Sequence, residues 1–275
     1  MRQGVYVRLK RLRIVLLPVL VLSLALAFTV SAQDRGPYHF GFKKSRNGQL
    51  PSINEEGFKD IIDKHGAVFL GDTGSKALYL TFDNGYENGF SPRILDTLKE
   101  KKVPAAFFVT GQFVREQPEL LKRMTAEGHI IGNHSWSHPD MTTISDAKIK
   151  EELDKVKEAA LRVTGQPDMT FLRPPRGIFS ERTLAVTKNM GYTNVFWSLA
   201  YMDWDVNAQK GAQYAYEKVM SQLHPGAVML LHSISRDNAE ALGRIIDGAR
   251  KQGYEFYSLH QLKEIRPENE IPGAL

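Results

Sequence analysis

The sequence contains no cysteine among its 275 residues. This absence excludes disulfide bonds, thiol catalysis and thiolate metal sites. It is compatible with export, because a folded part of roughly 240 residues buries a core large enough to be stable without cross-links. Internal repeats and low-complexity linkers are also absent, and a content of 42% hydrophobic and 24% charged residues is typical of one globular domain.

The chain beyond residue 32 has no formal net charge. The first 32 residues hold five of the 36 Lys and Arg residues and no Asp or Glu, so the other 31 basic residues match the 31 acidic ones. The formal charge of +5 therefore belongs to the N-terminal segment. A nucleic-acid-binding domain would carry its own basic patch, so we expect no nucleic-acid partner.

The N-terminal segment 1–32 has the layout of an export signal. Basic residues precede an apolar run over 14–30, and Val30-Ser31-Ala32 supplies small residues where a signal peptidase would cleave. This run of 17 residues is close to the roughly 20 that span a bilayer, so a cleaved signal peptide and a retained membrane anchor are both open. Either outcome predicts that the folded part lies outside the cytoplasm.

Strand and helix patterns alternate from about residue 76. Apolar, β-favouring stretches predict strands at 77–82, 105–110, 129–134, 170–174, 193–198, 227–232 and 254–259. The clearest helical patterns run from Ser145 to about Val163, from Ser180 to Gly191, and over 239–252. Parallel strands need a crossover, usually a helix, so the alternation predicts an α/β fold: a barrel or deformed (β/α) barrel of about seven parallel strands. The expected parts are the segment 1–32, an N-terminal extension 33–75 packed on the barrel, a barrel domain 76–265 and a C-terminal tail 266–275.

Polar residues gather at the ends of the predicted strands, where a parallel barrel has its active site. They are Asp83, Asn84, His134, His138, Arg173, Arg176, Asp203 and His232. In "HSWSHP" the two histidines lie four residues apart, which lets two imidazoles share one metal ion. Such a pair is also common as a surface accident or a structural hydrogen-bonded pair, so a metal site needs a third ligand from another strand end.

The stretch "TFDNG" can supply that ligand. Asn84 would bind the metal, and Asp83 would act as the base that takes a proton from water. The alternative is a simple turn, since Asp, Asn and Gly are turn formers. His232 could protonate a leaving amine, or it could be an ordinary buried histidine.

Arg173 could hold Asp83 ionised, or it could form an ordinary surface ion pair. The rigid Pro174-Pro175 would then present the amide of Arg176 as an oxyanion donor.

Five short motifs occur in the order "TFDNG", "HSWSHP", "RPPRG", "MDWD" and "LLH". Over about Lys76 to Leu262 the chain resembles the polysaccharide deacetylase family, the NodB-like carbohydrate esterases. The resemblance implies a deformed (β/α) barrel and metal-dependent removal of acetyl groups from polysaccharides, with zinc as the first candidate among divalent metals. It implies that Asp83 is the base, that His134 and His138 bind the metal, that Arg173 steadies the base, and that His232 is the acid.

Two positions depart from the family pattern. The usual Thr-Phe-Asp-Asp-Gly has a second Asp as a metal ligand, where this chain has Asn84. A carboxamide oxygen can bind a metal but brings no charge, so metal affinity should fall. The usual Asp-x-x-Asp-Trp begins here with Ala200, so Asp203 or Asp205 must orient His232, or that histidine is held in another way.

A narrower resemblance is to the delta-lactam-biosynthetic de-N-acetylases of spore-forming bacteria, which act on N-acetylmuramic acid in peptidoglycan during cortex formation. It implies a site in the cell wall or the forespore intermembrane space, and an N-acetylmuramoyl-L-alanine amidase as functional partner. Arg176 stands where most members have an aromatic residue, and a guanidinium suits the free lactyl carboxylate of muramic acid. Ordinary solvent-exposed pairing is the alternative for Arg176.

Three aromatic residues could stack on sugar rings: Tyr86, Trp136 and Trp204. Packing is the alternative for each of them. Two other functions stay open for the chain as a whole. It could be a deacetylase of chitin oligomers or xylan, or an inactive barrel that only binds glycan because Asn84 replaces the Asp ligand.

Overall fold

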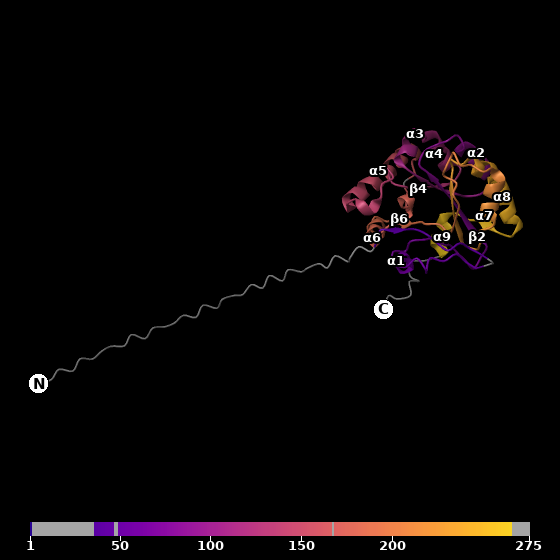
Figure 1. The fold of residues 1–275 in the computed structure, drawn as a ribbon. Helices are drawn as coiled ribbons and strands as arrows, with labels where there is room; N and C mark the ends of the chain where they lie inside the picture. Colours follow the sequence, from indigo (N-terminus) through magenta and orange to yellow (C-terminus); the bar gives the residue numbers. More distant parts are fainter. Residues whose placement is uncertain (2–35, 47–48, 167, 266–275) are drawn as a thin grey trace. The chain divides into compact units, whose positions relative to one another are not determined.

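The computed structural model describes residue 1 and residues 36–46, 49–166 and 168–265 (Figure 1). The predicted tail 266–275 lies outside these residues, and so does all of the predicted export segment except Met1. No helix of the described residues is both long and apolar enough to cross a bilayer. The boundaries that we predicted for the N-terminal extension and the barrel domain stay predictions.

A curled parallel sheet forms the centre of the fold, as a half-barrel. Its strand order is β7-β5-β4-β3-β2-β9-β8, with β10 pairing β2. The strands are β2 (Ala77–Asn84), β3 (Ala106–Val109), β4 (Ile130–Asn133), β5 (Phe171–Leu172), β7 (Thr193–Asn194), β8 (Leu199–Ala200), β9 (Ala227–His232) and β10 (Glu255–Phe256). Each predicted strand is present, although 170–174, 193–198 and 254–259 contribute only two strand residues each; β8 was not predicted.

Helices surround this sheet in Figure 1. They are α1 (Lys59–Lys64), α2 (Ser91–Lys101), α3 (Gly111–Glu116), α4 (Pro118–Ala126), α5 (Asp146–Thr164), α6 (Glu181–Asn189), α7 (Ala212–Met220), α8 (Arg236–Lys251) and α9 (Leu259–Ile265), with 3-10 turns η1 (Met141–Thr143) and η2 (Pro175–Gly177). The three helices predicted from sequence are confirmed as α5, α6 and α8. Ser145 caps α5 by accepting a hydrogen bond from the Lys148 amide, and Ser180 forms a capping box with Thr183 at α6.

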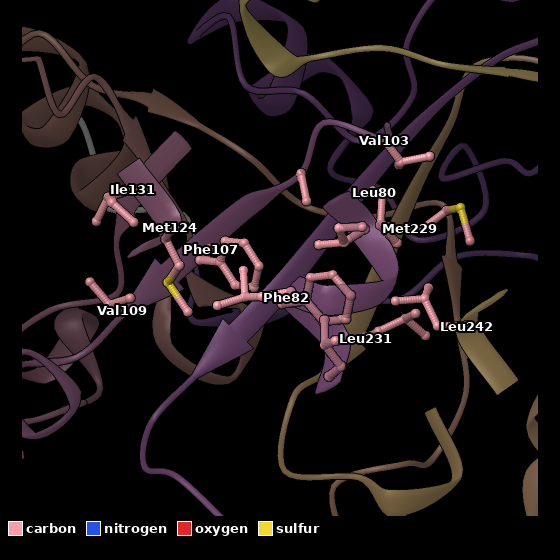
Figure 2. Packing of buried hydrophobic residues seen from close by; sticks show 14 of the residues in the cluster. Leu80, Phe82, Val103, Phe107, Val109, Met124, Ile131, Met229, Leu231 and Leu242 are labelled. Carbon is pink, nitrogen blue, oxygen red and sulfur yellow. The ribbon is translucent and has the colours of Figure 1, made fainter. Parts of the chain in front are cut away.

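The core lies between the sheet and these helices. Phe82 on β2 stacks on Phe107 on β3 with ring centroids 5.2 Å apart, and aliphatic side chains such as Leu231 surround them (Figure 2). All residues of β2 are buried, as expected when both faces of a parallel sheet are covered. Each such aromatic or aliphatic side chain contributes roughly 1.5–3 kcal/mol by leaving water. This packing fixes the strand ends that carry the polar residues.

The N-terminal extension packs on the open side of the half-barrel. Its strand β1 (Tyr38–His39) pairs antiparallel with β6 (Ile178–Phe179), and Phe40 stacks on Phe196 at 4.4 Å. Residues 68–71 hydrogen-bond to both sides of the opening: the Val68 amide donates to the Asn194 carbonyl, and the Gly71 amide donates to the Gly226 carbonyl. This segment therefore bridges β7 and β9, which the strand order leaves apart.

Candidate active site

A cavity of about 780 Å³ opens at the carboxyl ends of the parallel strands. Eight of the residues singled out from sequence line it: Asp83, Tyr86, His134, Trp136, His138, Arg176, Trp204 and His232. Arg173, Asp203 and Asn84 are not among its lining residues and are buried behind it. The structure thus brings the predicted residues together in two layers, one facing the cavity and one supporting it.

Asp83 at the end of β2 is held by Arg173. One guanidinium nitrogen lies 2.7 Å from Asp83 Oδ1, and a second donates to Thr81 Oγ1 at 2.9 Å. The Arg173 side chain is fully buried beneath the sheet end, with its guanidinium carbon 4.3 Å from the centroid of the Phe108 ring. Such a buried pair is costly to break, because removal of one partner leaves a charge without compensation.

Arg173 determines the charge state of Asp83. Burial raises the pKa of Asp83, but the Arg173 guanidinium beside it outweighs burial and holds that pKa below its usual range. Asp83 is therefore a carboxylate at neutral pH. Its second oxygen, Oδ2, lies 3.6 Å from His134 Nε2 and is on the side of the histidine pair.

His134 and His138 direct their Nε2 atoms at each other across 3.2 Å. His134 Nδ1 lies 2.8 Å from the Arg173 carbonyl oxygen, which can only accept, so Nδ1 carries the proton and Nε2 keeps its lone pair. Burial lowers the pKa of His138 to about 4, which leaves its imidazole neutral at pH 7. Two neutral imidazoles facing one point is the arrangement that a metal ion requires.

Buried polar groups that the sequence did not reveal brace the loop between these histidines. Glu152 on α5 accepts hydrogen bonds from both the amide and the hydroxyl of Ser137, at 2.7 and 3.0 Å. The Asn133 side chain accepts a hydrogen bond from the Ser135 amide at 2.9 Å. Both Ser135 and His138 have positive φ, at 63° and 57°, so the loop needs such support to keep its shape.

Asn84 points to a different partner from its neighbour Asp83. Its side chain is fully buried, and Nδ2 donates to Ser233 Oγ at 2.6 Å. Its Oδ1 is buried and has no hydrogen-bond partner among the described residues. If the side-chain oxygen and nitrogen of Asn84 are exchanged, Nδ2 becomes the atom without a hydrogen-bond partner. One buried amide atom is therefore unpaired in either orientation.

These residues fit a divalent cation. Two imidazole Nε2 atoms 3.2 Å apart and a buried carboxamide oxygen without a partner among the described residues are donors of the kind that zinc and similar metals accept. Within the described residues no group of three His, Asp or Glu side chains forms a metal site, so the third protein ligand would be the neutral Asn84. A set of three neutral ligands is weaker than one with a carboxylate.

His232 at the end of β9 is held by Asp203. Asp203 Oδ1 lies 2.7 Å from His232 Nδ1, and its Oδ2 accepts the His232 amide at 2.8 Å. Asn238 donates to the same Oδ2 at 2.6 Å. Asp205 instead accepts the Asn207 amide in a local turn, so Asp203 is the residue that compensates for Ala200.

The carboxylate of Asp203 changes the protonation of His232. Burial lowers the pKa of His232, but the Asp203 charge and hydrogen bond outweigh burial, and the pKa is raised. His232 therefore keeps its proton to a higher pH than a free histidine does. The site thus pairs a carboxylate whose pKa is lowered with an imidazole whose pKa is raised, each shifted by a buried partner.

The rim of the cavity is aromatic and basic. Trp204 and Tyr86 are 53% and 40% exposed, and the Trp204 ring lies 5.9 Å from the His232 ring. Arg176 is exposed with φ 58°, and in the described part of the chain no carboxylate pairs with its guanidinium. Trp197, which sequence reasoning missed, closes the wall beside Arg176: a Cβ at Gly177 would lie 2.7 Å from its ring, so only glycine fits there.

Comparisons with known proteins agree with this geometry. The family model described as Polysaccharide deacetylase matches residues 70–195. The chain is 51% identical over 243 residues to the peptidoglycan-N-acetylmuramic acid deacetylase PdaA of Bacillus subtilis (strain 168), covering 87% of this chain and 92% of the relative.

Two solved structures are also similar. The structure of Bacillus subtilis PdaA, a family 4 carbohydrate esterase, superimposes with a TM-score of 0.81 at 52% identity, covering 82% of this chain and 97% of that one. A family 4 carbohydrate esterase from Bacillus anthracis gives a TM-score of 0.67 at 52% identity, with the same coverage. Deacetylases of this family depend on a metal in general, in agreement with the paired histidines. The chain belongs to the polysaccharide deacetylase family.

Proposed function

We propose that this protein hydrolyses the N-acetyl amide of N-acetylmuramic acid in peptidoglycan. One observation carries the proposal: Asp83 and His232, register partners on β2 and β9, face one cavity, and a buried residue of opposite charge holds each of them. A carboxylate base and an imidazolium acid side by side are what amide hydrolysis needs. The similarity to PdaA supports peptidoglycan as the substrate.

The reaction uses the two residues in turn. Asp83 accepts a proton from the attacking water as the new C–O bond forms at the acetyl carbon. His232 donates its proton to the amide nitrogen as the C–N bond breaks, so acetate and a free amine leave. Arg173 keeps Asp83 ionised, and Asp203 raises the pKa of His232 and orients its ring. The backbone amide of Arg176 would stabilise the oxyanion.

His134, His138 and Asn84 would hold the divalent metal ion, with zinc as the first candidate. When bound, the metal supplies Lewis-acid chemistry, lowering the pKa of a water molecule and polarising the carbonyl. Asp83 lies beside this position through its Oδ2, 3.6 Å from His134 Nε2.

Arg176 would select muramic acid. Its exposed guanidinium, without a carboxylate partner in the described residues, can bind the lactyl carboxylate of a peptide-free muramic acid with two parallel hydrogen bonds. Tyr86 and Trp204 would stack on the sugar rings at the rim. A neutral glucosamine unit offers Arg176 no partner, which disfavours chitin oligomers.

The chemistry of the product suggests a wider role. The freed amine lies on the same sugar as the lactyl carboxyl and can close to a delta-lactam, as in the spore cortex. The lactyl carboxyl is free only after an amidase has removed the stem peptide, so an N-acetylmuramoyl-L-alanine amidase would act first. Such a role also requires export to the cell wall or the forespore intermembrane space, through the segment 1–32.

Release of acetate tests the proposed function. Purified protein is incubated with peptide-free peptidoglycan, chitin oligomers or acetylated xylan, with added zinc or with a chelator, and the products are identified by mass spectrometry. We expect acetate from peptidoglycan alone, its loss with chelator, and a mass loss on muramic acid. If no acetate is released with any metal, the proposed function is wrong, and the alternative of an inactive barrel that only binds glycan stands.

A further inference from the structure

A second cation lines the cavity on the far side of the histidine loop. Arg115 lies on α3, after β3, and its side chain is exposed. In the described part of the chain no carboxylate forms an ion pair with it. Neither the hydrolytic residues nor the Arg176 site uses this arginine.

Trp136 holds Arg115 in place. The guanidinium carbon of Arg115 lies 5.1 Å from the centroid of the Trp136 ring, within the range of a cation–π contact. The indole is itself fixed, because the Gly111 amide donates to the Trp136 carbonyl at 3.1 Å and a Cβ at Gly111 would lie 2.3 Å from the ring. Gly111 and Arg115 are four residues apart, so they lie on the same side of α3. The arginine is thus pre-organised without an anion.

The two arginines stand apart across one strand. Arg176 follows β5 and Arg115 follows β3, and β4 lies between these strands and leads to Trp136. Neighbouring strands are about 4.8 Å apart, so the ends of β3 and β5 are about 10 Å apart. Two cations with an aromatic surface between them match a chain of sugars that carries carboxylates at intervals.

The charge balance of the cavity favours an anionic chain. Asp83 is the one carboxylate among the residues that line the cavity, and Arg173 neutralises it. Arg115 and Arg176 therefore leave the cavity wall positive, which attracts carboxylates.

We propose that Arg115, stacked on Trp136, binds the lactyl carboxylate of a second muramic acid residue of the same glycan strand. The inference rests on the proposed function, because peptide-free peptidoglycan carries such a carboxylate on every second sugar. Arg176 would bind the carboxylate of the residue being deacetylated, and Arg115 that of the next muramic acid. The site then recognises a tetrasaccharide better than a disaccharide.

The test compares peptide-free oligosaccharides with one and with two muramic acids. We expect R115Q to raise KM on the tetrasaccharide about tenfold, as for the loss of one charge-assisted contact, with kcat and the disaccharide KM unchanged. R115K keeps the charge without the planar guanidinium, so its KM on the tetrasaccharide should lie between those of wild type and R115Q. K251Q removes an exposed charge on α8 and should leave both substrates unchanged.

Three outcomes overturn the inference: equal changes on both substrates, no change on either, or a change only when the outer muramic acid keeps its stem peptide. The last would assign Arg115 to a peptide carboxylate. Binding measured by calorimetry in a D83N/R173M background, in which neither charge of the pair stays buried, gives the same comparison without hydrolysis. Thermal melting shows whether R115Q is folded, and R115K carries the test if it is not. Absence of acetate from wild type on both oligosaccharides would instead contradict the proposed function.

Discussion

Asp83 and His232 are register partners on the neighbouring strands β2 and β9, and a buried residue of opposite charge holds each of them. Arg173 approaches Asp83 from β5, and Asp203 approaches His232 from the loop after β8. The two ion pairs leave one base and one acid facing the same space. Four predictions follow from the partners of these residues and of the cavity.

Replacement of Asp203 should impair His232 and not the fold alone. In D203N the carboxylate that raises the pKa of His232 is lost, so the histidine deprotonates at lower pH. We expect kcat to fall about 10²–10⁴-fold, as for the loss of a general acid, and the basic limb of the pH profile to move to lower pH. D205N, whose carboxylate serves a local turn, is the matched control. An unmoved basic limb in D203N would contradict the role of His232.

Removal of Arg173 should destabilise the protein in a pH-dependent way. R173M leaves Asp83 buried and unpaired, which costs about 3–5 kcal/mol in the free energy of unfolding. The pKa of Asp83 is depressed in the folded state, so the ion pair stabilises above the unfolded pKa and this stabilisation is lost as pH falls through the folded pKa.

Urea titrations over a pH series measure this difference. The difference in free energy of unfolding between wild type and R173M should become smaller at low pH. D83N/R173M should recover part of the lost stability, because no charge stays buried. A gap that is constant with pH would show that packing alone is involved.

A charged residue at position 84 should strengthen the metal site. N84D replaces a neutral ligand with a carboxylate, and the Ser233 hydroxyl can donate to it in place of accepting from Nδ2. We expect zinc affinity, measured by calorimetry without substrate, to rise at least about tenfold because ligand charge tunes affinity. S233A tests the hydroxyl by itself. Unchanged or weaker binding in N84D would place Asn84 outside the metal site.

Arg176 should matter only for muramic acid. Loss of one charge-assisted contact to the lactyl carboxylate should raise KM about 10–100-fold for R176A on peptide-free muramic substrates. On glucosamine oligomers, which we do not expect to be hydrolysed, binding measured by calorimetry should be the same for R176A and wild type, since no carboxylate is present. R176K keeps the charge and should lose less. Equal effects on both substrates would argue that Arg176 shapes the cavity and does not select the sugar.

The sequence predicted the strands and their polar ends because hydrophobic stretches and motif order are local signals. It left open whether Asp203 or Asp205 holds His232, since both lie in one loop and only the fold brings Asp203 to the histidine. Glu152 and Asn238 were not foreseen. Each lies on a helix and reaches the site from behind, where a buried polar residue has no periodic pattern to mark it.

Residues 68–71 have a practical consequence for anyone who trims this protein. A fragment that begins at the family motifs, near Lys76, would lack residues 68–71, the segment that bridges β7 and β9. Unpaired backbone groups at the edge of a sheet pair readily with strands of other molecules. The fragment should therefore aggregate during expression. Shortened versions intended for crystals or assays should therefore start before Tyr38 and keep the whole aromatic cluster around Phe40.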